Sequence, residues 1–209
     1  MKIRSDSFQD GQPIPAEFAF GKPDGAGRIA LSANRSPHLA WDEVPAGTRS
    51  FVLLCIDPDV PTVPETVNRD DVAIPAEQPR GEFVHWVMAD IPADCRELAA
   101  GACSDGVTPR GKRQPEGPVG SRQGLNDYTG WFAGDADMGG DYFGYDGPCP
   151  PFNDQRVHRY FFRLYALDVP SLGLSGRFGR AEVERAMQGH VLAEAAIHGT
   201  YTTNARRAG

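Results

Sequence analysis

The sequence predicts a single, mainly β domain in which antiparallel sheets pack into a sandwich. Three segments rich in β-branched and aromatic residues are bounded by turn formers and are predicted to be interior strands: 50–56, 83–91 and 159–167. The 24 glycines and 18 prolines favour turns and long ordered loops over a helical bundle. Only residues 181–198 have helical periodicity, and we expect them to form a C-terminal helix on the outside or at one end of the sandwich.

The remaining predicted elements are weaker. Residues 29–31 and 39–41 are short strand candidates and suggest an early meander. Pro45-Ala46-Gly47 is a turn signal, so we expect 39–41 to form a hairpin-like unit with 50–56. The predicted helix rests on Val183 and Met187 and on their continuation at four-residue steps, with a stop at Gly199.

Size and charge limit the class of protein. The 209 residues, taken as one domain over 1–209, are enough to bury about 70% of the unfolded chain's surface without disulfides or metals. The net charge of −7 disfavours nucleic acid and anionic lipid surfaces as partners, so we expect peripheral membrane contact or none. Residues 1–15 lack the apolar run of a signal peptide, which predicts a cytoplasmic protein.

The four cysteines are scattered, without a Cys-x-x-Cys pair, so we predict no metal site and no cofactor. We expect buried free thiols. Cys95 and Cys103 are close enough in sequence to form a small loop, but we do not expect them to pair in a reducing compartment.

Polar residues stand at the ends of the predicted strands. Asp57-Pro58-Asp59-Val60-Pro61 follows the first strand, and its prolines hold both carboxylates in a constrained turn. An Asx turn would explain the same pattern without a function. Alternation places His85 on one strand face with Phe83 and Val87, although a lone strand histidine is more often a core residue.

The third group lies around the last predicted strand. In the segment 144–151, glycine stands beside proline, which would let backbone N–H groups approach a ligand while the prolines keep the loop from closing over it. His158 and Tyr160 share a strand face by alternation. If these groups meet in one cleft, they bring together two histidines, a carboxylate and a tyrosine hydroxyl.

These motifs, in this order, resemble the phosphatidylethanolamine-binding protein family, also called Raf kinase inhibitor-like proteins. The resemblance rests on Asp57-Pro58-Asp59-x-Pro61, His85-Trp86, Gly-Pro-Cys-Pro-Pro at 147–151 and His158-Arg159-Tyr160. It is strongest to the bacterial and archaeal branch, through Ser-Pro-His-Leu-Ala-Trp at 36–41, Val-Pro-Ala-Gly-Thr at 44–48 and Gly-His-Val-Leu-Ala-Glu-Ala at 189–195. The resemblance covers residues 18–201.

The resemblance implies a β-sandwich with a small pocket for phosphate, acetate or a phosphorylated head group. By position it assigns the pocket to eight residues: Asp57, Val60, Pro61, His85, Gly147, Pro148, His158 and Tyr160. Asp59 and Arg159 are implied to brace the turn. The resemblance also implies that the protein forms a homodimer and inhibits a kinase or protease.

Anion binding at such a site would come from histidine N–H groups and backbone donors. Because Asp57 repels an anion, we expect it to bind a histidine N–H and raise that histidine's basicity. Two departures from the resemblance bear on the ligand. Residues 128–141 look like an insertion, and Asp146 stands where the branch usually has glycine, so we expect extra acid and aromatics at the pocket mouth.

Two other functions remain open. Asp57, His85 and His158 could hold a metal ion and activate water, as in a hydrolase, although the sequence has no hydrolase motif. Alternatively, the aromatic segment 128–145 docks a partner as an interaction module. A non-enzymatic binding protein is the function we expect.

Overall fold

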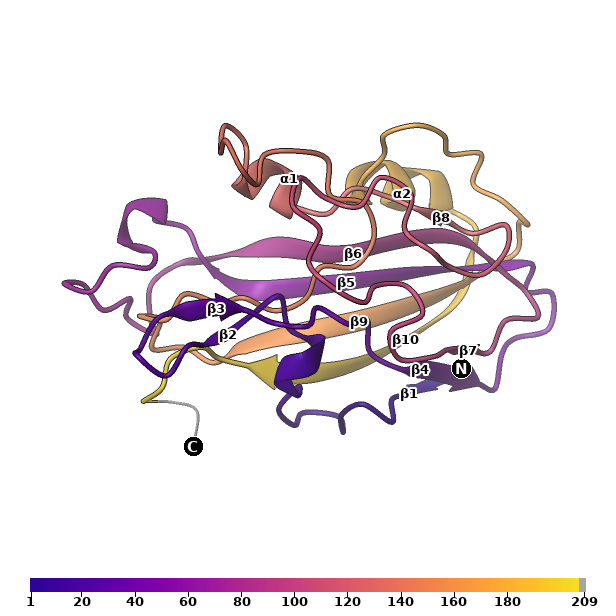
Figure 1. Ribbon diagram of the computed structural model, residues 1–209. Coiled ribbons are helices and arrows are strands. Elements are labelled where there is room, and N and C mark those ends of the chain that lie inside the picture. The colour runs from indigo at the N-terminus through magenta and orange to yellow at the C-terminus, as the bar shows by residue number, and fades with distance from the viewer. Residues whose placement is uncertain (207–209) are drawn as a thin grey trace.

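Four long strands form the centre of the molecule (Figure 1). The computed structural model describes residues 1–206. The five-stranded antiparallel sheet has the order β10-β9-β5-β6-β8, and smaller sheets have the orders β1-β4-β7 and β2-β3. The strands are β1 Lys2–Arg4, β2 Gly21–Pro23, β3 Ile29–Leu31, β4 Leu39–Asp42, β5 Ser50–Pro61, β6 Arg80–Pro92, β7 Glu97–Leu98, β8 Arg122–Gln123, β9 His158–Leu167 and β10 Val191–Tyr201.

The helices are short: η1 Ala16–Phe18 and η2 Pro64–Thr66 are 3-10 turns, and α1 Tyr128–Trp131 and α2 Arg180–Met187 are α-helical. In Figure 1, α1 and α2 are drawn above β6, and the sheet of β1, β4 and β7 lies below the large sheet. Helix α2 packs on one face of the large sheet, whereas Tyr128 of α1 packs against Phe20 and Phe83 on the other side. The predicted class, mainly β with antiparallel sheets, is confirmed.

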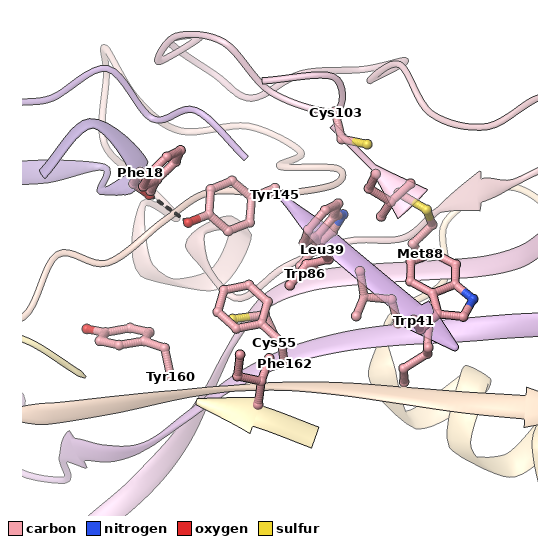
Figure 2. Close-up of a cluster of buried hydrophobic side chains, with 14 of the residues drawn as sticks. Phe18, Leu39, Trp41, Cys55, Trp86, Met88, Cys103, Tyr145, Tyr160 and Phe162 are labelled. Atoms are coloured by element: carbon pink, nitrogen blue, oxygen red, sulfur yellow. Dashed lines mark hydrogen bonds between the residues drawn. The ribbon is translucent and has the colours of Figure 1, made fainter. Parts of the chain in front are cut away.

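The two faces of the large sheet pack differently. Its inner face contributes Phe51, Leu53, Trp86 and Phe162 to the main core, which also contains Leu39 and Trp41 of β4. Figure 2 shows this cluster, with Tyr145 pointing its hydroxyl at the carbonyl of Phe18. The outer face contributes Val52, Leu54 and Val87, which are covered by Val183 and Met187 of α2.

The predicted C-terminal helix is wrong in its second half. The helix ends at Met187, Gly189 has a φ of +83°, and β10 then runs antiparallel to β9 from Val191 to Tyr201. The four-residue spacing of apolar residues continues past the turn, but strand pairing supplies a backbone hydrogen-bond partner along all of β9. Tertiary pairing therefore overrides the local pattern.

The predicted hairpin of 39–41 with 50–56 is also wrong. The strand β4 pairs with β1 and β7, and β5 pairs with β6 and β9. The turn at Pro45 to Gly47 takes the chain from one layer of the sandwich to the other. Residues 29–31 pair with β2 and form no meander with β4.

Alternation along β6 breaks at His85. Phe83 lies on the inner side, but Val87, predicted to share its face, belongs to the outer cluster together with Val84, and Trp86 and Met88 both belong to the inner one. The register shifts between Cys55 and Ile56 on the facing strand, so the strand pair carries a β-bulge at this point. The bulge adds one residue to the inner side and frees His85 for the cavity described below.

The cysteines are free thiols, with Cys55 and Cys103 buried and Cys95 and Cys149 partly exposed. Within residues 1–206, no helix is long and apolar enough to cross a membrane.

Candidate functional site

The predicted site residues meet where β5 ends and β6 and β9 begin. Asp57 lies on β5, His85 on β6, and His158 and Tyr160 on β9. A second register shift between Asp57 and Val60 turns the end of β5. These four residues line one end of a cavity of 220 Å³, and we call this group the histidine end. Val60 and Pro61 line the cavity as well.

His158 is held between two carboxylates. Its Nδ1 lies 2.7 Å from Oδ2 of Asp57, and its Nε2 lies 3.0 Å from Oδ2 of Asp154. Burial lowers the pKa of His158, but Asp57 and Asp154 raise it by more, to about 9. At neutral pH the ring is therefore an imidazolium that donates both of its N–H groups within the protein.

This geometry supports one expectation and corrects another. Asp57 binds a histidine N–H and raises the basicity of the ring, as the sequence predicts. However, His158 has no N–H left for a ligand, because Asp154 takes the second one. Arg80 in turn binds both oxygens of Asp154, so the four groups form a buried chain of alternating charge.

The charge state of His85 differs from that of His158. Its Nδ1 donates to the carbonyl of Asp146 at 2.8 Å, which fixes the tautomer because a carbonyl oxygen only accepts. Burial lowers the pKa of His85, and the nearby Asp57 carboxylate opposes this only in part. The ring is therefore neutral at pH 7. Its Nε2 has no hydrogen-bond partner within residues 1–206 and presents a lone pair to the cavity.

Aromatic rings surround His85. The ring centroids of Phe83, Tyr160 and Tyr128 lie 4.9, 5.1 and 5.6 Å from that of His85. Burial, with a further contribution from Asp57, raises the pKa of Tyr160 well above its usual range, so its hydroxyl stays protonated. Figure 2 shows this hydroxyl pointing away from Cys55 and Phe162, out of the core.

Asp59 supports the turn and lies outside the cavity lining. The Nε and Nη2 groups of Arg159 bind its two oxygens at 2.8 and 2.9 Å, and Arg156 binds at 3.1 Å. Burial raises the pKa of Asp59, but these donors lower it by more than burial raises it, so the pKa of this carboxyl is below its usual value. Arg159 lies against Asp59 and does not line the cavity.

Gly147 and Pro148 do not line the cavity, in contrast to the prediction. The amide of Gly147 donates to Oδ1 of Asn34, and its carbonyl accepts from the Tyr128 hydroxyl. The carbonyl of Pro148 accepts from the amides of Phe20 and Gly21. These backbone groups therefore hold two chain segments against each other, and Cys149, Pro150 and Pro151 line the cavity in their place.

Asp146 is a buried anchor, so the expected extra acid at the pocket mouth is wrong. Its carboxylate accepts hydrogen bonds from Asn34, Asn126 and Lys112, each at 2.7–2.8 Å. The side chain is almost fully buried. Its role is to fix the peptide whose carbonyl orients His85.

The expected extra aromatics are present. Five rings form one side of the cavity, and we call them the aromatic wall: Phe20, Phe83, Tyr128, Trp131 and Phe132. The rings of Phe20 and Tyr128 stack at 4.6 Å, and those of Tyr128 and Phe132 at 5.7 Å. Three of the five come from the segment 128–141, which is packed in place by the buried Tyr142.

Sequence reasoning missed Asp154 and Arg80. Asp154 stands four residues before His158, and this spacing was an available signal in the sequence. Arg80 stands just before the predicted strand 83–91, and nothing in the local sequence indicates its partner.

Comparison with known proteins shows the family. The model of the phosphatidylethanolamine-binding protein family matches residues 4–202. This chain belongs to that family. It is 36% identical over 201 residues to a UPF0098 protein of Aquifex aeolicus, covering 96% of this chain and 88% of that protein. It is 34% identical over 197 residues to the UPF0098 protein YbhB of Escherichia coli, covering 94% and 97%.

Solved structures agree with this family membership. The crystal structure of Escherichia coli YbcL, described as a member of the mammalian PEBP family, matches with a TM-score of 0.69 and 26% identity, over 96% of this chain and 97% of that one. The putative PEBP homologue CT736 from Chlamydia trachomatis matches with a TM-score of 0.64 and 28% identity, over 96% and 95%.

The chemistry open to this family member at its histidine end is limited. Both nitrogens of His158 and one nitrogen of His85 are bound within the protein. No group of three or more His, Cys, Asp or Glu side chains in residues 1–206 is placed to hold a metal ion. A hydrolase that uses Asp57, His85 and His158 together as metal ligands would have to break the contacts of His158 with its two carboxylates.

Proposed function

We propose that this protein binds, without chemical turnover, a small ligand whose anionic or phosphorylated head group sits at the histidine end. The observation that supports this proposal is the single open nitrogen, Nε2 of His85, at the inner end of a cavity of 220 Å³. The ring of Tyr160 lies 5.1 Å from that of His85, measured between centroids, and its residue lines the same cavity, which adds a hydroxyl as a second polar group.

The neutral state of His85 sets the form of the head group. A lone pair at Nε2 accepts a hydrogen bond, so it repels a fully ionised anion and binds one that still carries a proton. Phosphate monoesters have a second pKa near 6 and supply such a proton at neutral pH. The complex then holds one proton shared between a phosphate oxygen and Nε2.

This sharing makes affinity depend on pH. As pH rises from 6 to 8, the free phosphate monoester loses the proton that the complex needs, so affinity should fall at least tenfold. Three carboxylates face or approach His85, those of Asp57, Asp127 and Asp146, and each favours the protonated ring. They strengthen proton uptake on binding and do not reverse its sign.

The test compares methyl phosphate with methyl sulfate by NMR titration at pH 6, 7 and 8. The two ligands share size and shape, but the sulfate ester carries no proton at these pH values. We expect methyl phosphate to bind more tightly, with an affinity that falls with pH. Equal affinity of the two ligands, or an affinity independent of pH, would contradict the proposal.

A variant pair completes the test. His85→Phe keeps a ring inside the aromatic surroundings and removes the open nitrogen, so it should abolish methyl phosphate binding. His190→Gln is the control, because His190 is partly exposed, pairs with Asp168 and lies at the far end of the β9–β10 pair. Unchanged binding in His85→Phe would overturn the proposal.

A further inference from the structure

The cavity extends well beyond the histidine end. Of its 17 lining residues, most are apolar or aromatic, and none is Lys or Arg. The polar groups of the lining are largely used within the protein: Tyr128 donates to Gly147, and the Asn68 side chain accepts from the amide of Phe152. A ligand that filled the cavity would therefore meet few polar partners away from His85 and Tyr160.

A bare inorganic ion fits this cavity poorly. Transferring a charged group from water costs free energy unless cations or hydrogen bonds replace the water, and here no free cation lines the site. The buried charges of Asp57, His158, Asp154 and Arg80 alternate in sign and cancel. Affinity must therefore come from another part of the ligand.

The aromatic wall supplies a surface for that part. A dry cavity of about 150 Å³ accommodates a benzene molecule. The 220 Å³ observed here therefore has room for a ring of that size and a small head group beside it. The wall is held in place by the stacking of Phe20 on Tyr128 and by the Tyr128 hydrogen bond to Gly147.

Trp131 lies at the rim of this wall. It is the last residue of α1, and 48% of its surface is exposed, although it lines the cavity. Trp41 and Trp86, the other two tryptophans of the sequence, are 3% and 0% exposed. A large apolar side chain left in solvent at the cavity rim is able to cover a bound apolar group.

We propose that the natural ligand carries, next to its phosphorylated head group, an apolar group about the size of a benzene ring, which packs on the aromatic wall under Trp131. This inference rests on the proposed function. On this proposal, the segment 128–132 selects the apolar group of the ligand, and His85 binds the head group.

The experiment compares phenyl phosphate with methyl phosphate, which carry the same head group and differ in apolar size. Phenyl phosphate should bind at least tenfold more tightly by calorimetry. Trp131→Ala should reduce this preference about tenfold and leave methyl phosphate affinity within twofold. The substitution is at a half-exposed position, so we expect the variant to fold. Val119→Ala, at a position 94% exposed and outside the cavity, is the matched control.

Tryptophan fluorescence gives an independent readout. With excitation at 295 nm, acrylamide quenches an exposed tryptophan much more than buried ones, so quenching reports mainly on Trp131. Phenyl phosphate should protect Trp131 from acrylamide, and methyl phosphate should not. Equal affinities for the two esters with unprotected Trp131 would refute the apolar subsite and leave the proposed function standing.

Two further outcomes separate the proposals. If neither ester binds, both the proposed function and the subsite are wrong. If benzylammonium binds more tightly than phenyl phosphate and protects Trp131, the apolar subsite stands and the anionic head group is wrong. The last result would assign the polar end to a cation held by Asp57 and the surrounding rings.

Discussion

The buried imidazolium of His158 predicts that the protein loses stability as pH rises from neutral to alkaline. The folded state holds the pKa of His158 at about 9, and the ordinary value in an unfolded chain is about 6.5. Because the folded pKa is the higher one, the stabilisation is complete below pH 6.5 and is lost as pH rises through 9. Over this window the folded state binds one more proton than the unfolded state.

The magnitude follows from the shift. A difference of one pKa unit corresponds to about 1.4 kcal/mol, so this residue contributes about 3 kcal/mol below pH 6.5. Domains of this kind are stable by about 5–15 kcal/mol, so a loss of this size is easily measured. The expected slope is at most about 1.4 kcal/mol per pH unit.

Urea unfolding of the native chain and of His158→Gln, between pH 6 and pH 9.5, measures the effect. The free energy of unfolding of the native chain, relative to the variant, should fall by about 3 kcal/mol across this range. Buried thiols also titrate late, because burial raises the pKa of Cys55, Cys103 and Cys149. Their contribution is common to both proteins and cancels in the difference.

A direct titration guards against a variant that does not fold. The Cε1–H signal of His158 in the native chain should keep its protonated position at pH 8, whereas that of His85 should be neutral at pH 7. A midpoint for His158 at or below 6.5, or a pH-independent difference between the two proteins, would refute the assignment of an imidazolium between two carboxylates.

Three further substitutions test the scaffold of the site by urea unfolding at pH 7. Gly147→Ala places a Cβ against the backbone carbonyl of Phe18 and should lower the free energy of unfolding by about 2–3 kcal/mol. An unchanged urea midpoint would show that the two segments are not in close contact. Asp146→Asn removes the carboxylate that pairs with the poorly exposed ammonium of Lys112, and it should lower the free energy of unfolding by about 3 kcal/mol. A loss below about 1 kcal/mol would show that the ion pair is solvated. Val119→Ser, at a position 94% exposed, should stay within about 0.5 kcal/mol of the native chain.

Much of the sheet could be predicted from the sequence because its central strands carry their own signal. The segments 50–56, 83–91 and 159–167 are all strands in the structure, each extended by one to five residues. Their cores are buried on both faces, so runs of β-branched and aromatic residues are conspicuous in them. The end of β5 was missed because Val60 and Pro61 still pair with β6, beyond a register shift after Asp57 that no local pattern reveals.

The C-terminal region could not be predicted for a related reason. Residues 191–201 form an edge strand whose burial pattern is weak, with Val191 and Leu192 both 42% exposed. Its conformation is set by pairing with β9 and, at Thr200, by hydrogen bonds with residues 12 and 14. Neither β9 nor residues 12 and 14 are adjacent to this strand in the sequence, so the periodicity of residues 191–201 alone cannot predict the pairing.

The site shows the same division. Six of the eight residues assigned to the pocket line one cavity, because strand register alone brings Asp57, His85 and His158 to the same end of the sheet. The role of each residue was not predictable in the same way. It depends on contacts from the loop 146–154, where Asn126 binds Asp146 from 20 residues away and Arg80 binds Asp154 from 74 residues away.

One histidine of the cavity is therefore charged and the other is neutral, and this difference determines what each can bind. His158 is charged because two carboxylates face it, but its charge is cancelled locally and both N–H groups are used. His85 is neutral because a backbone carbonyl takes its only N–H and burial disfavours a charge. The charged ring thus holds the ends of β5 and β9 together, and the neutral ring keeps a nitrogen open to the cavity. A substitution that made His158 neutral would weaken the scaffold, whereas one that removed the nitrogen of His85 would change binding and leave the scaffold in place.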